Sequence, residues 1–123
     1  MQAHFINHSR FITLFVALLP LACKPSTQNS KEAIIQTSAI CEMCKERLEK
    51  DLKTTKGVQK ASLNLADKKM TVIFDSTQTN VANIRIAISQ IGYDADKVAG
   101  VKEAHDKLPD CCQKTNKNAK HNE

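Results

Sequence analysis

The chain has 123 residues, a length typical of one small domain, with a net charge of +5 and 5 cysteines. Aromatic residues make up 4% of the sequence and tryptophan is absent, so large aromatic surfaces for stacking nucleic-acid bases are scarce. The sequence also has no arginine-rich cluster or nucleic-acid motif. We therefore do not expect nucleic acid as a partner.

The first 22 residues predict a signal peptide. A polar start precedes an apolar run of about a dozen residues, which suits a signal-peptide core and falls short of the roughly 20 residues of a membrane-spanning helix. Cys23 follows directly. This ending resembles a bacterial lipoprotein signal, in which the cysteine bears the lipid, although Pro20 stands where that family usually has leucine. Plain secretion and an uncleaved anchor are the alternatives.

Export to the periplasm or cell envelope is therefore expected, with a lipid anchor at Cys23 in a bacterial membrane. Residues 23–31 combine this anchor with a flexible linker, because their polar side chains and proline bury too little apolar surface to fold. The folded domain is predicted at residues 32–99. Residues 100–123 are predicted to hold a short helix, a Cys-Cys pair and a disordered tail.

The order of elements in the domain indicates its fold. Residues 32–37 are rich in β-branched side chains and predict a strand. A helix follows near Cys44, which forms an apolar stripe with Leu48 and Leu52. Further along, the patterns predict strands at 58–65 and 70–74, a helix at 81–91 that Gly92 ends, and a short edge strand at 93–98. This β-α-β-β-α-β order predicts an α+β, ferredoxin-like sandwich, a four-stranded antiparallel sheet with two helices on one face.

Cys41-Glu42-Met43-Cys44 lies between the first strand and the first helix. Metal ions bind thiolates, and the first turn of a helix favours negative charge at Cys44. Lys45 adds a neighbouring cation. Two thiolates suit an ion that accepts few ligands, such as Cu(I) or Hg(II), whereas Zn(II) prefers four.

Several short segments together resemble one known family. They occur in order at 37–44, 57–58, 72–75 and 91–93. This arrangement is similar to the heavy-metal-associated domain of copper chaperones, metal-pumping ATPases and periplasmic mercuric-ion-binding proteins, and it covers residues 32–98. The sequence departs from the family at Ala39, where methionine is usual, and at Ile40, where threonine is common.

The resemblance implies that Cys41 and Cys44 are the metal ligands and that the ring of Tyr93 approaches the metal loop. It implies a metal-binding protein rather than an enzyme, one that captures a soft ion and transfers it to a metal-transporting membrane protein or another thiol-bearing carrier. Thiol-disulfide exchange by the same cysteines and an inert disulfide are the alternatives. Covalent haem is disfavoured, because Lys45 stands where a haem motif needs histidine.

Residues 101–108 have apolar positions at helical spacing and predict a short amphipathic helix that Pro109 ends. We expect this helix to cover Ile86, the large apolar residue that faces away from the core stripe of the second helix. His105, within the same segment, is expected at the surface rather than as a metal ligand.

Cys111 and Cys112 are adjacent, and adjacent cysteines seldom bond to each other because the ring is strained. They are possible additional metal ligands, completing a three- or four-sulfur site with Cys41 and Cys44. Alternatively, they are oxidised, crosslinked between chains, or idle. The sequence leaves both interpretations open.

Overall fold

The computed structural model describes residues 29–113. Cys23, the predicted signal peptide and most of the predicted linker lie outside the described residues, as does the predicted tail beyond residue 113. The described elements are β1 Ser30–Gln36, α1 Glu42–Lys53, β2 Val58–Asn64, β3 Lys69–Asp75, α2 Val81–Ile91, α3 Lys102–His105 and the short 3-10 helix η2 Asp110–Cys112. The first five follow the predicted order, and α2 has the predicted bounds.

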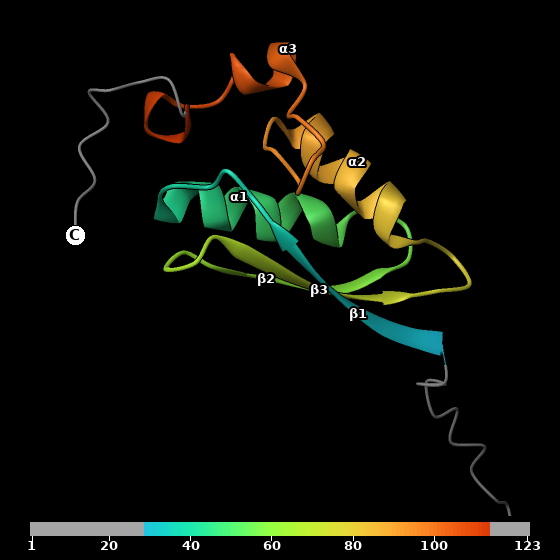
Figure 1. Ribbon diagram of the computed structural model, residues 1–123. Coiled ribbons are helices and arrows are strands. Elements are labelled where there is room, and N and C mark those ends of the chain that lie inside the picture. The colour runs from blue at the N-terminus through green and yellow to red at the C-terminus, as the bar shows by residue number, and fades with distance from the viewer. Residues whose placement is uncertain (1–28, 114–123) are drawn as a thin grey trace, which may run out of the picture.

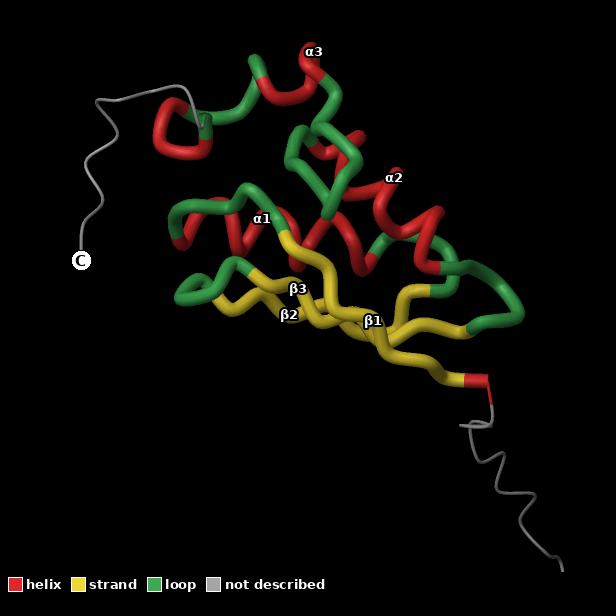
Figure 2. Tube along the Cα trace, viewed as in Figure 1, coloured by secondary structure: helices red, strands yellow, loops and turns green. Residues whose placement is uncertain are grey.

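The sheet has the order β1-β3-β2, and both neighbouring pairs are antiparallel. Along the central strand β3, Met70, Val72 and Phe74 are buried and alternate with less buried side chains. Successive strand residues point to opposite faces, so these three share one face. Helices α1 and α2 cover one face of the sheet (Figures 1 and 2), and the core lies between the two layers.

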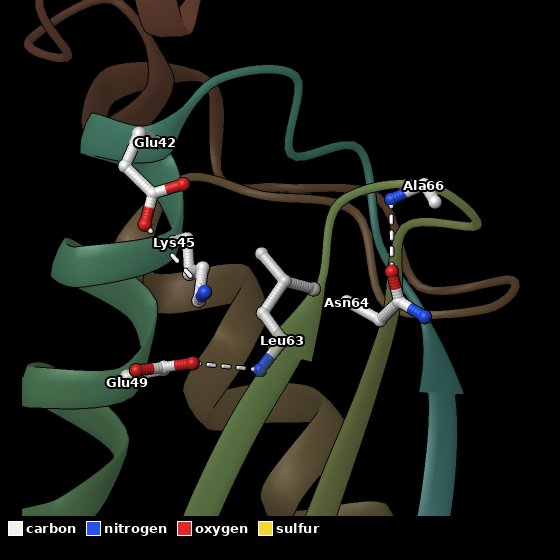
Figure 3. A network of polar contacts seen from close by, with 6 residues as sticks. All are labelled: Glu42, Lys45, Glu49, Leu63, Asn64 and Ala66. Atoms are coloured by element: carbon white, nitrogen blue, oxygen red, sulfur yellow. Dashed lines mark hydrogen bonds and ion pairs between the residues drawn. The ribbon is translucent and has the colours of Figure 1, made fainter.

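Helix α1 buries the predicted stripe of Cys44, Leu48 and Leu52. A hydrogen bond also ties this helix to the sheet edge, because the backbone N–H of Leu63 donates to Oε1 of Glu49 over 2.8 Å (Figure 3). The bond gives a partner to a backbone donor of edge strand β2, which would otherwise need water. It helps to fix α1, and therefore the cysteines at its start, relative to the sheet.

Helix α2 has clear signals at both ends. The side chain of Asn80 accepts a hydrogen bond from the N–H of Asn83 over 2.9 Å and caps the start of the helix. Ile84 and Ile88 are fully buried. Gly92 ends the helix as predicted, with a φ of 112°, a left-handed conformation that costs glycine little.

The predicted edge strand at 93–98 is wrong for the described residues, whose sheet has three strands. The segment meets the end of β1 through two hydrogen bonds between Asp96 and Gln36, and an isolated bridge joins Ala95 to Thr37 just beyond the strand. The chain then reverses at once, since Ala95 and Val98 exchange backbone hydrogen bonds of 2.8 and 2.9 Å around Asp96, whose φ is 55°. This tight turn leaves no length for a continuous strand pairing.

The C-terminal segment differs from expectation in two respects. Ile86 is 49% exposed, so the segment does not cover it, and His105 is buried rather than at the surface. Helix α3 instead lies beside the end of α2, and η2 reaches the start of α1 (Figure 1). Within residues 29–113, no helix is both long and apolar enough to cross a membrane.

Candidate metal centre

The loop before α1 is fixed by one hydrogen bond within the loop and by one from a segment distant in sequence. The N–H of Ala39 donates to Oγ1 of Thr37 over 3.3 Å, and the N–H of Asp94 donates to Oγ of Ser38 over 3.0 Å. Ala39 is fully buried where the family usually has a larger methionine. These contacts anchor the chain just before the first cysteine.

Cys41 is the N-cap residue of α1, and Cys44 lies in the first helical turn, as predicted. Their sulfur atoms are 3.0 Å apart, and neither forms a disulfide. Cys41 is partly exposed, whereas Cys44 is buried. The pair therefore has one sulfur accessible to an incoming ligand and one fixed in the core.

The two thiols have different acidities. Burial raises the pKa of Cys41 to about 11, and its hydrogen bond with Cys44 contributes. Burial also opposes ionisation of Cys44, but hydrogen bonds from the Ile40 backbone and from the thiol of Cys41 lower its pKa overall. The arrangement favours a thiolate at Cys44 that accepts a hydrogen bond from Cys41.

Helix η2 places Cys111 and Cys112 next to Cys41. The sulfur of Cys41 lies 3.7 Å from that of Cys111 and 3.6 Å from that of Cys112, and the last two sulfurs are 3.8 Å apart. All three lie within 4.8 Å of one another, a grouping compatible with one metal ion. The structure thus unites all four predicted cysteines, with Cys41 in contact with each of the others, while their roles as ligands stay a prediction.

The ring of Tyr93 was predicted to approach the metal loop, and Lys45 to place a cation beside Cys44. Tyr93 is fully buried, and its pKa is raised well above the ordinary range by burial and then by the thiols of Cys112 and Cys44. Its hydroxyl has no hydrogen-bond partner among the described residues. Lys45 is half-buried on the same side of α1 as Glu49, and its ammonium group is 3.5 Å from the carboxylate of Glu42 (Figure 3).

Met43 is a soft donor that the sequence analysis did not single out. Its Sδ atom lies 3.7 Å from the sulfur of Cys111, and the side chain is exposed. In the sequence, the one indication that Met43 lies near the metal site is its position between the two cysteines of the motif. Cys111, the residue that Met43 contacts, is 68 positions away, so the contact depends on how the C-terminal segment folds.

The comparison with protein families decides the identity of this region. The pattern of the heavy-metal-associated domain matches residues 38–94. Residues 38–94 form a heavy-metal-associated domain. The cysteine motif and Tyr93 lie inside the match, whereas Cys111 and Cys112 lie beyond it. The Cys-Cys pair is therefore a feature of this chain outside the matched domain.

A copper-exporting P-type ATPase of Bacillus subtilis (strain 168) is 41% identical over 64 residues, which are 51% of this chain and 8% of the ATPase. The chain thus spans only a small part of that relative. A CopZ metallochaperone structure has a TM-score of 0.51 and 29% identity, covering 53% of this chain and 98% of its own. Oxidised MerP from Ralstonia metallidurans CH34 shares the fold, with a TM-score of 0.52 and 20% identity over 55% of this chain and 94% of MerP.

These comparisons establish the ferredoxin-like architecture of the domain, with three strands rather than four in its described part. They also place it among domains found in copper chaperones and metal-pumping ATPases. A soft metal ion is the ligand that this relationship and the cysteine cluster indicate.

Proposed function

We propose that this protein captures a soft metal ion through Cys41 and Cys44 and passes it to another thiol-bearing protein. The observation that supports the proposal most directly is the pair of sulfurs, 3.0 Å apart, at the start of α1 in a heavy-metal-associated domain. Helix N-termini favour thiolates. The protein acts as a binding and transfer module rather than as an enzyme.

Cu(I) is the ion that we favour, because the relative with 41% identity is a copper-exporting ATPase. Thiolates also bind Hg(II) tightly, but the likeness to MerP concerns the fold alone at 20% identity. Zn(II) is the least favoured of the three candidates, because it prefers four ligands and the motif supplies two.

Transfer would occur by exchange of thiolate ligands. Cys41 is partly exposed and Cys44 is buried, so a partner's thiolate would replace Cys41 first while Cys44 still holds the ion. The metal keeps its oxidation state, and the released cysteine takes a proton from solvent. A metal-transporting membrane protein is the partner that we propose, by analogy with the ATPase relatives.

We also propose that the protein works in the bacterial cell envelope, attached by a lipid at Cys23. The support comes from the apolar run that ends at this cysteine. Metabolic labelling with a fatty-acid probe should mark the wild-type chain and leave Cys23→Ser unlabelled. Equal labelling of the two chains would contradict the anchor while leaving metal binding untouched.

The decisive experiment titrates the reduced full-length chain with Cu(I), Hg(II) and Zn(II) under anaerobic conditions. We expect Cys41→Ser/Cys44→Ser to lose at least about 100-fold in Cu(I) affinity, equivalent to about 2.7 kcal/mol. Ser62→Ala, at an exposed position of β2, is the control and should bind as the wild type does. Wild-type affinity in the double variant would refute the proposal.

Thiol-disulfide exchange is the rival function, and the short distance between the sulfurs of Cys41 and Cys44 is compatible with it. An activity assay distinguishes metal transfer from thiol-disulfide exchange. An exchange protein should accelerate the reduction of a disulfide-linked peptide at catalytic concentrations and should not need a metal. Such catalysis, together with weak Cu(I) binding, would favour the rival.

A further inference from the structure

The C-terminal extension, residues 99–113, is a packed part of the molecule. It starts at α2, where Oγ of Ser89 donates to the carbonyl of Ala99 over 2.6 Å and the N–H of Val101 donates to the carbonyl of Ser89 over 2.9 Å. The N–H of Gly100 also donates to Oδ1 of Asp94 over 2.9 Å. Three hydrogen bonds thus fix the direction in which the extension leaves the domain.

Two glycines let the extension approach closely. A Cβ atom on Gly100 would lie 2.7 Å from the carbonyl oxygen of Gly92, and one on Gly92 would lie 2.9 Å from the backbone N of His105. Backbone atoms cannot yield as a flexible side chain can. The absence of side chains at both positions is therefore required for this packing.

The extension ends at the cysteine cluster. Leu108 and Cys112 are buried, and Nε2 of Gln113 donates to the carbonyl of Leu108 over 2.8 Å, which closes the last turn. Helix η2 consequently holds Cys111 and Cys112 against Cys41, across 70 and 71 positions of sequence. The two thiols are delivered by folded structure, not by a free tail.

The distances within this cluster match those between metal ligands. With metal–sulfur bonds of about 2.3 Å, two sulfurs of a three- or four-sulfur site lie about 3.8–4.0 Å apart. The three distances among Cys41, Cys111 and Cys112 are 3.6, 3.7 and 3.8 Å. The 3.0 Å between Cys41 and Cys44 is shorter than such an edge. The triangle is therefore better arranged for an ion than the pair in the motif.

From this geometry we infer that Cys41, Cys111 and Cys112 form a three-sulfur site that retains the ion after capture. The inference rests on the proposed function and adds a second position for the same ion, with Cys41 common to both. Bonds from the metal to Cys111 and Cys112 form and the bond to Cys44 breaks. The oxidation state is unchanged, the two entering thiols release protons to solvent, and Cys44 takes one up.

A partner would then have to displace the extension, which returns the ion to Cys41 and Cys44, before the transfer proposed above can occur. Residues 99–113 therefore slow release. The test loads the full-length chain with Cu(I) and counts sulfur neighbours by X-ray absorption, then measures release to a Cu(I) chelator. The wild type should show three sulfurs. Cys111→Ser/Cys112→Ser should show two and release Cu(I) at least about tenfold faster, equivalent to about 1.4 kcal/mol.

Two further variants separate ligand loss from misfolding. Gly100→Ala keeps every thiol but forces the extension away from Gly92, and it should lose a sulfur neighbour and release Cu(I) faster. Gly57→Ala introduces a Cβ atom that crowds the side chain of Thr79, away from the extension, and should keep three sulfurs. Urea unfolding of each ion-free variant checks that it is folded.

The outcomes distinguish the two proposals. Two sulfurs in the wild type, or unchanged release in Cys111→Ser/Cys112→Ser, would overturn the three-sulfur site and leave capture by Cys41 and Cys44 standing. No Cu(I) binding by the wild type would overturn both. Cys44→Ser gives an independent check, because it should retain three sulfurs, whereas Cys41→Ser should lose the site.

Discussion

The Nδ1 atom of His105 lies 3.0 Å from the carbonyl oxygen of Gly92. A carbonyl only accepts hydrogen bonds, so Nδ1 bears the proton and donates it. The bond joins α3 to the end of α2 inside the protein, where His105 is buried. It is a polar contact where the backbone of the extension passes close to Gly92.

His105→Ala should therefore lower the free energy of unfolding of the ion-free protein. It leaves the Gly92 carbonyl without its side-chain partner and opens a cavity, for a combined loss of about 1–3 kcal/mol. Urea denaturation measures the loss. Lys107→Ala, at an exposed neighbouring position, is the control and should change stability by less than about 0.5 kcal/mol. Equal stability of the two variants would mean that the contact does not hold the extension.

Gly92→Ala should be more damaging than Gly57→Ala. Both glycines have positive φ angles, 112° at Gly92 and 84° at Gly57. The new Cβ atom would meet backbone atoms of Ala104 and His105 at Gly92, but mainly the side chain of Thr79 at Gly57. We expect losses of about 2–4 kcal/mol for Gly92→Ala and about 1–2 kcal/mol for Gly57→Ala, compared by thermal and urea unfolding. The reverse ranking would contradict this account of the packing.

Substitutions at Tyr93 should separate the role of its ring from that of its hydroxyl. The hydroxyl is buried without a hydrogen-bond partner among the described residues, so Tyr93→Phe should preserve stability or raise it by up to about 1 kcal/mol. Tyr93→Ala removes a fully buried ring and should cost about 3–5 kcal/mol. Urea unfolding of the reduced, ion-free proteins gives both values, and a large loss in Tyr93→Phe would show that the hydroxyl is stabilising.

The ion pair between Arg85 and Asp96 should make stability depend on pH. Oδ2 of Asp96 lies 2.7 Å from Nε of Arg85, and its Oδ1 accepts from the N–H of Gln36 over 2.9 Å. Although burial opposes ionisation, the guanidinium of Arg85 and the N–H of Gln36 lower the pKa of Asp96. A carboxylate whose pKa is lower in the folded state stabilises above its unfolded pKa of about 3.9, and this contribution is lost as pH falls through the folded pKa.

Asp96→Asn tests this pH dependence, because asparagine tolerates the φ of 55° and can still accept from Gln36. At pH 7 the variant should be less stable by about 0.5–1 kcal/mol, a modest value because both partners are partly exposed to solvent. The difference should vanish in acid and shrink in high salt. Unfolding curves at several pH values measure it, and a difference that persists below the folded pKa would assign the effect to something other than charge.

Local patterns predicted most of the helices and strands correctly. The stripe of Cys44, Leu48 and Leu52 and the bounds of α2 depend on side-chain periodicity and capping within a few residues. The edge strand at 93–98 failed because its apolar residues suited a strand, while the turn at Asp96 depends on partners in β1 and α2. The predicted surface position of His105 was wrong for a similar reason, because its burial depends on Gly92 lacking a side chain.

The cysteine motif and its place at the start of a helix could be predicted from the sequence alone, because both depend on residues close together along the chain. The resemblance to the heavy-metal-associated domain could be recognised because it depends on the order and spacing of short segments and not on their contacts. The positions of Cys111 and Cys112 relative to the motif, by contrast, follow from how the C-terminal segment packs on the domain. Their sulfurs meet Cys41 across 70 and 71 positions, and no local pattern encodes such a distance. The close approach of Gly92 and Gly100 and the packing of the C-terminal extension bring the thiols together.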